Sequence, residues 1–255
     1  MLPYLYCLSV PHVSKVEYWA SGQRLSWTRA LRQRYGAFTR RHRRGDALHE
    51  MRWIRGGGTM AEKAVRIGDL AERIAPLVGA NPDQAKSAGA LSKADLATQM
   101  VGEFPELQGH VGHLLHTLAG EDETVALALE EHYLPRYSGD DLPTSTVGLA
   151  VALADRIDTL TGCFSLGLKP KGSADPLGLR RAAGGTLALI RNARVRIKIS
   201  DLLALSAFDA PDNRWASLED FIAARMRAQP GCERGVQERN PELHVAWACA
   251  CACAC

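Results

Sequence analysis

The chain has 255 residues, of which 46% are hydrophobic and 23% are charged, and its formal net charge is +3. This composition excludes collagen, a small disulfide-stapled domain and a wholly disordered chain, and the length suffices for one sizeable hydrophobic core. Because no run of eighteen consecutive apolar residues occurs, the sequence predicts no membrane span.

Positive charge is concentrated at the start of the chain. Residues 1–58 contain eleven Lys and Arg residues against three acids, a net of +8, and the rest contains twenty against twenty-five, a net of −5. The run from Arg40 to Arg44 lies near Tyr35 and Phe38, a combination that can bind nucleic acid or simply be solvated. We interpret residues 1–58 as an irregular basic segment that is not native to the domain that follows.

From Thr59 onward the sequence has the pattern of packed helices. Thr59 and Glu62 have the spacing of a capping box. Apolar residues then follow at alternating three and four positions: Ala64, Ile67, Ala71, Ile74 and Val78. Asn81 and Pro82 are a second start signal, for a helix that is predicted to run to about Met100.

The same pattern predicts further helices. A third apolar stripe occupies residues 107–118, a fourth helix runs from Glu121 to about Tyr133, and Thr144 or Ser145 caps a fifth. The sixth helix is predicted to open at Asp175, and two more are predicted to be capped by Ser200 and Ser217.

The helical period is lost after Gln229, so the predicted domain covers residues 59–229. The fold class is all-α, a multi-helix domain with irregular N- and C-terminal extensions. Residues 230–255 are predicted to be a disordered low-complexity tail that ends in alternating Cys and Ala. Five of the seven cysteines lie at or after Cys232, which is not a disulfide framework and favours a reducing, cytoplasmic location.

Three histidines recur at every third position of the third predicted helix: His110, His113 and His116. Imidazoles at this spacing can share a metal ion, although three of them turn around the helix and do not all meet at one point. A metal site would also need a carboxylate, for which Asp155 or Asp158 would serve. We favour histidines at the edge of an amphipathic helix and predict no metal site.

Asp155 and Asp158 lie one turn apart in the fifth predicted helix. Paired acids could bind a cation or act as general acid and base. Arg156 lies between them, and Arg180 and Arg181 could face them from the sixth helix. Acids in a core are usually hydrogen-bonded partners of such arginines, so we predict a structural role.

Four cations flank the loop before the sixth helix: Lys169, Lys171, Arg180 and Arg181. Flexible lysines and a helix start are suited to phosphate contacts, so these are the predicted RNA-binding residues; a solvated charged loop is the alternative. The chain has no Walker glycine pattern, nucleophile elbow, dinucleotide fingerprint or zinc-binding pair, and we predict no catalytic residue.

Seven motifs follow one another over about residues 59–229. They are Lys93-Ala-Asp-Leu96, Met100-Val-Gly-Glu-Phe-Pro-Glu-Leu-Gln-Gly109, Gly120-Glu-Asp-Glu123, Glu131-His-Tyr-Leu-Pro-Arg136, Gly139-Asp-Asp-Leu-Pro143, Ala152-Leu-Ala-Asp-Arg-Ile-Asp-Thr-Leu160 and Asp175-Pro-Leu-Gly-Leu-Arg-Arg-Ala182. In this order they resemble the β subunit of bacterial glycyl-tRNA synthetase.

The resemblance implies a tetramer of two α and two β subunits that joins glycine to tRNA(Gly). ATP, with Mg, is used at the α subunit, whereas the β subunit contributes mainly to tRNA recognition, so no cofactor is expected in this chain. The motifs are similar to the HD-like helical domain in the middle of the β subunit, a relative of His-Asp metal phosphohydrolases.

The chain departs from these patterns in two places. The His-Asp pair of the hydrolases corresponds to Ala94 and Asp95, without the histidine, and relatives usually have aromatic and basic residues where this chain has residues 113–118. The start does not resemble the family's N-terminal region, and we expect the chain to lack the family's anticodon-binding domain.

We therefore expect a cytoplasmic fragment of the β subunit that offers tRNA-binding surface and no chemistry of its own. One alternative is an HD-type metal-dependent phosphohydrolase that uses His110, His113 and Asp155 or Asp158. The other is a purely structural helical module that holds subunits together.

Overall fold

The computed structural model describes residues 17–20, 23–26, 46–170, 175–193, 197–209 and 211–227. Within these residues the regular elements are helices, apart from an antiparallel hairpin of β1 (Glu17–Ala20) and β2 (Gln23–Ser26), which pairs Glu17 with Ser26. The α-helices are α2 (Asp46–Glu50), α3 (Met60–Ile74), α4 (Pro82–Leu91), α5 (Gln99–Glu103), α6 (His110–Ala119), α7 (Glu123–Glu131), α8 (Thr146–Ser165), α9 (Leu179–Ala193), α10 (Ile199–Ala204) and α11 (Asp212–Arg227). Three 3-10 helices join them: η1 (Ala75–Val78), η2 (Ala94–Ala97) and η3 (Pro105–Leu107). The predicted all-α class is confirmed, and the HD-like assignment stays a prediction.

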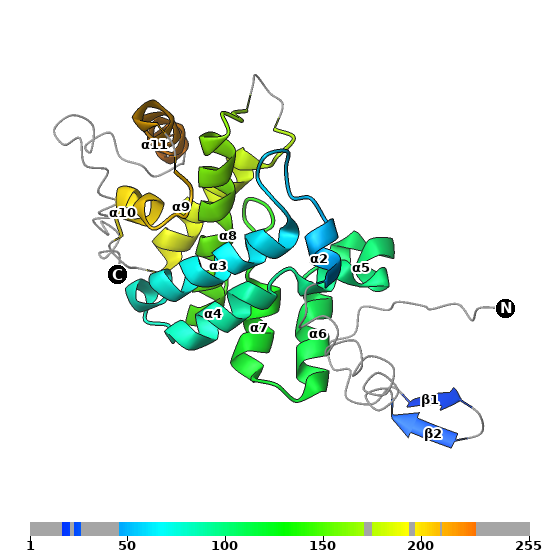
Figure 1. Ribbon diagram of the computed structural model, residues 1–255. Coiled ribbons are helices and arrows are strands. Elements are labelled where there is room, and N and C mark those ends of the chain that lie inside the picture. Colours follow the sequence, from blue (N-terminus) through cyan, green and yellow to red (C-terminus); the bar gives the residue numbers. More distant parts are fainter. Residues whose placement is uncertain are drawn as a thin grey trace, which may run out of the picture.

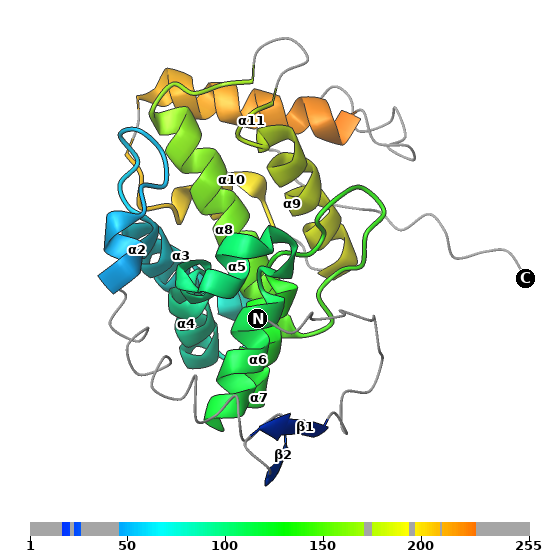
Figure 2. The same ribbon diagram turned by 90° about the vertical axis from the view of Figure 1, so that its right-hand side faces the viewer.

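Helix α8 is the centre of the helical body. It contacts α3, α4, α7, α9, α10 and α11, and Figures 1 and 2 show it running between the other long helices. Its sequence explains this position, because residues 147–154 are all apolar or glycine and every one of them is buried. A helix that is apolar on all sides must be covered on all sides.

Local capping signals identify the starts of several helices correctly. Thr59 and Glu62 form the predicted capping box on α3, with the Thr59 amide donating to Glu62 Oε2 at 2.8 Å and the Glu62 amide donating to Thr59 Oγ1 at 3.2 Å. Asn81 accepts from the Gln84 amide at the start of α4, and Ser145 accepts from the Gly148 amide at the start of α8.

The second helix is shorter than the sequence predicts. It ends at Leu91 instead of near Met100, and the chain continues through η2 before Thr98 caps α5 by accepting from the Val101 amide at 3.0 Å. The hydroxyl of Ser92 donates to the Gly89 carbonyl at 2.7 Å, a side-chain bond to the backbone that competes with continuation of the helix. The interruption lets both Lys93 and Asp95 be buried.

Three predicted helix starts are wrong in detail. Helix α9 begins at Leu179, because the Asp175 carboxylate accepts from the amides of Leu179 and Arg180 and so caps it from four residues upstream. Helix α10 begins at Ile199, one residue before the predicted cap Ser200. Ser217 lies inside α11, which begins just after Pro211.

Residues 46–58 pack against the helical body. Leu48 is buried, Arg52 forms an isolated bridge with Thr59, and Trp53 packs against the hydrophobic core. The packed part of the described chain therefore starts before residue 59, and the division of the chain at residues 58 and 229 stays a prediction. None of the helices in the described ranges has the length and hydrophobicity that a membrane span requires.

Candidate functional site

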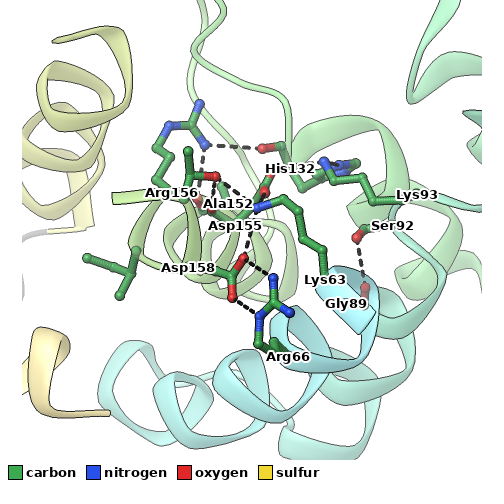
Figure 3. A network of polar contacts seen from close by, with 12 residues as sticks. Lys63, Arg66, Gly89, Ser92, Lys93, His132, Ala152, Asp155, Arg156 and Asp158 are labelled. Atoms are coloured by element: carbon green, nitrogen blue, oxygen red, sulfur yellow. Dashed lines mark hydrogen bonds and ion pairs between the residues drawn. The ribbon is translucent and has the colours of Figure 1, made fainter. Parts of the chain in front are cut away.

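A network of charged and polar side chains, most of them buried, lies between α3, α7, α8 and the turn after α4 (Figure 3). We call it the buried charge network; its members are Lys63, Arg66, Lys93, His132, Asp155 and Asp158. Lys63 and Arg66 lie one turn apart on α3, and Asp155 and Asp158 lie one turn apart on α8. Side chains at this spacing share a helix face, so two packed helices bring two cations against two carboxylates.

The Asp158 carboxylate is held by two cations from α3. Lys63 Nζ lies 3.0 Å from its Oδ2, and the Arg66 guanidinium donates to both oxygens, at 2.7 Å from Nε and 3.3 Å from Nη2. Arg66 also lies over the rings of Trp53 and Phe208, with its central carbon 5.2 and 4.6 Å from their centroids. Asp158 is 2% exposed, so its charge depends on these partners.

Asp155 is held by two lysines. Its Oδ1 lies 2.9 Å from Lys63 Nζ and its Oδ2 lies 2.7 Å from Lys93 Nζ. Burial by itself would raise the pKa of Asp155, but the ammonium groups of Lys63 and Lys93 outweigh that effect and hold the pKa well below its usual value. Asp155 is therefore an anion at neutral pH and is not a general acid.

His132 completes the network in a defined protonation state. Its Nδ1 lies 2.9 Å from the Leu129 carbonyl oxygen, which can only accept, so Nδ1 carries the hydrogen. Its Nε2 then accepts from Lys93 Nζ at 3.0 Å. Burial, followed by the nearby Lys93 charge, holds the pKa of His132 well below its usual value, so the ring stays neutral.

Arg156, between the two aspartates in the sequence, does not pair with either of them as predicted but binds backbone carbonyl groups. Its guanidinium donates to the carbonyl oxygens of Ala152, His132, Tyr133 and Pro135 at 2.9 to 3.2 Å. Burial lowers its pKa to about 10, so it remains charged at neutral pH. It therefore binds the chain that leaves α7 to the side of α8.

Glu131 has a similar structural task beside His132. Its carboxylate accepts from the amide and hydroxyl of Thr144 at 2.8 and 2.6 Å, and from the amide and hydroxyl of Ser145 at 3.1 and 2.5 Å. The adjacent motif residues Glu131 and His132 thus fix both the start of α8 and the network on its side.

The partners of Asp155 and Asp158 differ from the predicted arginines. The cations that contact them come from α3 and from the turn after α4, whereas the Arg181 guanidinium lies beside Gly178 at the start of α9. Sequence reasoning missed Lys63, Arg66, Lys93 and His132. A signal existed for Lys63, which stands four residues before Ile67 on the apolar stripe of α3.

Two of the three histidines of α6 contact a carboxylate of α7, not the aspartates of α8. His110 Nδ1 and His113 Nδ1 contact the two oxygens of Glu130 on α7, at 2.9 and 2.5 Å. The ligand set of the alternative hydrolase reading, two histidines with Asp155 or Asp158, is therefore not brought together. No group of three potential ligands placed to hold a metal ion occurs among the described residues.

Asp95, which is predicted from the sequence to correspond to the aspartate of the hydrolases, supports the start of α6. Its Oδ2 accepts from the Gly109 amide at 2.6 Å. Burial raises its pKa, as expected for a carboxyl group that is 3% exposed.

These contacts predict stability that does not depend on metal. The melting temperature of the full chain should be the same in EDTA and in added Mn²⁺, and His110→Ala with His113→Ala should not change that insensitivity. Differential scanning fluorimetry checks this. A rise in melting temperature with Mn²⁺ that the double substitution abolishes would contradict it.

The predicted RNA-binding cations are placed only in part. Lys169 Nζ donates to Ser217 Oγ on α11 at 2.6 Å, and Arg180 and Arg181 lie in the first turn of α9. Lys171 lies outside the described residues, as do the basic run from Arg40 to Arg44 and the Cys-Ala tail. Their role in RNA binding stays a prediction.

Comparison with known proteins gives one consistent result. The sequence model of the family described as "Glycyl-tRNA synthetase beta subunit" matches residues 39–239. Proteins named "Glycine--tRNA ligase beta subunit" from Glaesserella parasuis serovar 5, Psychromonas ingrahamii and Hahella chejuensis are 49%, 47% and 43% identical over 176, 178 and 175 residues. Each alignment covers 67% of this chain and 25–26% of the relative, so the chain spans about a quarter of the length of these curated relatives.

Proposed function

Because the chain belongs to the glycyl-tRNA synthetase β-subunit family, we propose that it supplies a helical tRNA-binding domain to a glycine–tRNA ligase. The observation that carries the proposal is 49% identity over 176 residues, together with a family match to residues 39–239, which include the helical body. In this proposal the α subunit is the partner that activates glycine with ATP and Mg, in the cytoplasm, and this chain binds tRNA(Gly) beside it.

The charges of the network support a role without chemistry. Both oxygens of Asp155 and of Asp158 contact cations, and His132 gives its single lone pair to Lys93. A general base needs a free lone pair within reach of a substrate proton. The buried charge network is therefore best understood as the connection that fixes α3, α7 and α8 in one arrangement.

The distribution of charge limits where RNA can bind. Residues 94–135 include no Lys or Arg, and six of their eight acids are not buried, so the surface formed by α5, α6 and α7 repels phosphate groups. Lys169 and the start of α9 lie at the other end of α8, and Arg181 is exposed there. We place the RNA contact on this end because binding to RNA needs a local concentration of cations.

The proposal predicts that Lys169→Ala with Lys171→Ala weakens tRNA binding by the full chain. Each phosphate contact contributes up to about 0.9 to the slope of log K against log salt, so the slope should become shallower by about one to two. Fluorescence anisotropy with labelled tRNA(Gly), titrated between about 50 and 200 mM salt, measures both quantities.

Ser217→Ala is the matched control for this experiment. It removes the hydrogen bond that Lys169 makes to α11 but keeps the charge, so tRNA binding should stay close to that of the parent chain. If the double lysine variant binds tRNA with unchanged affinity and salt slope, this end of α8 is not the RNA contact.

A further inference from the structure

Two histidines of α6 share one carboxylate of α7. His110 and His113 are one helical turn apart, and each places its Nδ1 against a different oxygen of Glu130. Both oxygens of this carboxylate thus contact imidazole nitrogens of the neighbouring helix. The bonds cross between two helices that are consecutive in the chain and packed side by side (Figure 1).

Few other contacts hold α6. In the described residues it packs mainly on α7, with η2 at its start. Val111 and Leu118 are its buried residues, whereas Leu114, between them on the predicted apolar stripe, is 38% exposed. A helix with so little buried apolar surface belongs to the part of a fold that opens most easily. Polar bonds to its neighbour then carry a larger share of its stability.

The surroundings leave Glu130 dependent on these histidines. Arg136, which follows α7, faces His110 and opposes its protonation, and its Nη2 lies 3.4 Å from the Gln108 carbonyl. From η2, Asp95 lies under Gly112 on α6 and is held by the Gly109 amide. With no Lys or Arg between residues 94 and 135, protonated imidazoles are the cations that α6 can offer to Glu130.

We propose that His110, His113 and Glu130 form a pH-sensitive clasp, which holds α6 against α7 more firmly as the pH falls from about 8 to 6. The hydrogen bond that His110 donates to Glu130 raises the pKa of His110 and outweighs the opposing effects of partial burial and Arg136. A group whose pKa is raised by folding stabilises the fold fully below its unfolded value, about 6.5, and loses that contribution as the pH rises through the folded value.

The sign of the effect distinguishes the clasp from other titrating groups nearby. His132 is buried with its pKa well below the usual value, so it does not change charge between about pH 6 and 8. The pKa of Glu130 is strongly lowered by its bonds to His110 and His113, so it stays ionised throughout this range. The raised pKa of His110 therefore sets the sign of the effect, because the clasp is strongest where His110 is protonated.

Hydrogen exchange of the full chain, followed by mass spectrometry at about pH 6 and pH 8, tests the clasp. After correction for the intrinsic pH dependence of exchange, peptides that contain α6 should be about threefold better protected at the lower pH, the size expected for partly exposed charge pairs. Peptides from α8 should show no such change. Glu130→Gln should abolish the difference, and so should His110→Gln combined with His113→Gln.

His49→Gln, which removes an exposed histidine from α2, is the matched control and should keep the difference. Equal protection of α6 at the two pH values in the parent chain would overturn the clasp. A difference that persists both in Glu130→Gln and in the double histidine variant would overturn it as well. Because none of these measurements involves RNA, they are independent of the proposed function.

Discussion

Replacing Gly89 with alanine is expected to lower the free energy of unfolding by about 3 kcal/mol, the upper end of what overpacking costs. Gly89 of α4 lies directly against the backbone of α3. A Cβ at this position would stand 2.7 Å from the Gly68 Cα, 2.8 Å from the Gly68 nitrogen and 2.9 Å from the Ile67 carbonyl oxygen. All three are backbone atoms, which cannot rotate away, so the two helices would have to separate.

Gly184→Ala is the matched control for this substitution. Gly184 lies inside α9, and a Cβ there meets nothing within 4 Å. Alanine in a helix is favoured over glycine by roughly 0.5–1 kcal/mol, so this variant should be as stable as the parent or more so. Urea denaturation followed by circular dichroism compares the two, and equal stabilities for both variants would show that the α3–α4 contact has room to relax.

The close approach at Gly89 is an example of what the sequence does not reveal. No sequence pattern around Gly89 predicts a contact with Gly68. The two glycines meet only because α3 and α4 pack against each other. The starts of α3, α4 and α8 were predictable because a cap is a bond between residues two or three positions apart. The end of α4 was not predicted: the Ser92 hydroxyl bonds back to the Gly89 carbonyl there, and Lys93 and Asp95 beyond it are buried.

The buried charge network shows the same limit on the functional side. The spacing of Asp155 and Asp158 placed them on one face of a helix, and in the structure both carboxylates are ion-paired. The lysines that pair with these aspartates lie more than sixty positions away in the chain. Sequence patterns instead suggested Arg180 and Arg181, which lie nearer in the chain. Only the position of Lys63 on an apolar stripe indicated that a charge was buried there.

Lys63→Met is expected to lower the free energy of unfolding by about 3 kcal/mol, because it removes one partner from a buried ion-paired network. Lys63 contacts Asp155, Asp158 and the Thr159 hydroxyl, and its ammonium lies 4.5 Å from the centre of the Trp53 ring. Methionine keeps most of the volume of the side chain, so the loss reports the charge and not a cavity.

Lys86→Met is the matched control, because Lys86 also contacts two acids, Asp69 and Glu72, but at the surface. Water screens that pair, so the substitution should leave stability close to that of the parent. A further variant tests whether the cost comes from the carboxylate left behind. Asp158→Asn removes one of the charges that Lys63 neutralises. The variant with both Lys63→Met and Asp158→Asn should therefore lose less free energy of unfolding than the sum of the losses in the two single variants.

The dependence on pH gives an independent check on the same network. The pKa of Asp155 is lowered in the folded chain, so its contribution is present above the unfolded value of about 3.9 and is lost as the pH falls further. Lys63→Met weakens the attraction that lowers this pKa, so the variant should lose its remaining stability at a higher pH than the parent on acid titration. Two results would show that these charges do not act as a coupled network. One is an equal loss of free energy of unfolding in Lys63→Met and Lys86→Met. The other is a loss in the variant with both Lys63→Met and Asp158→Asn that equals the sum of the two single losses.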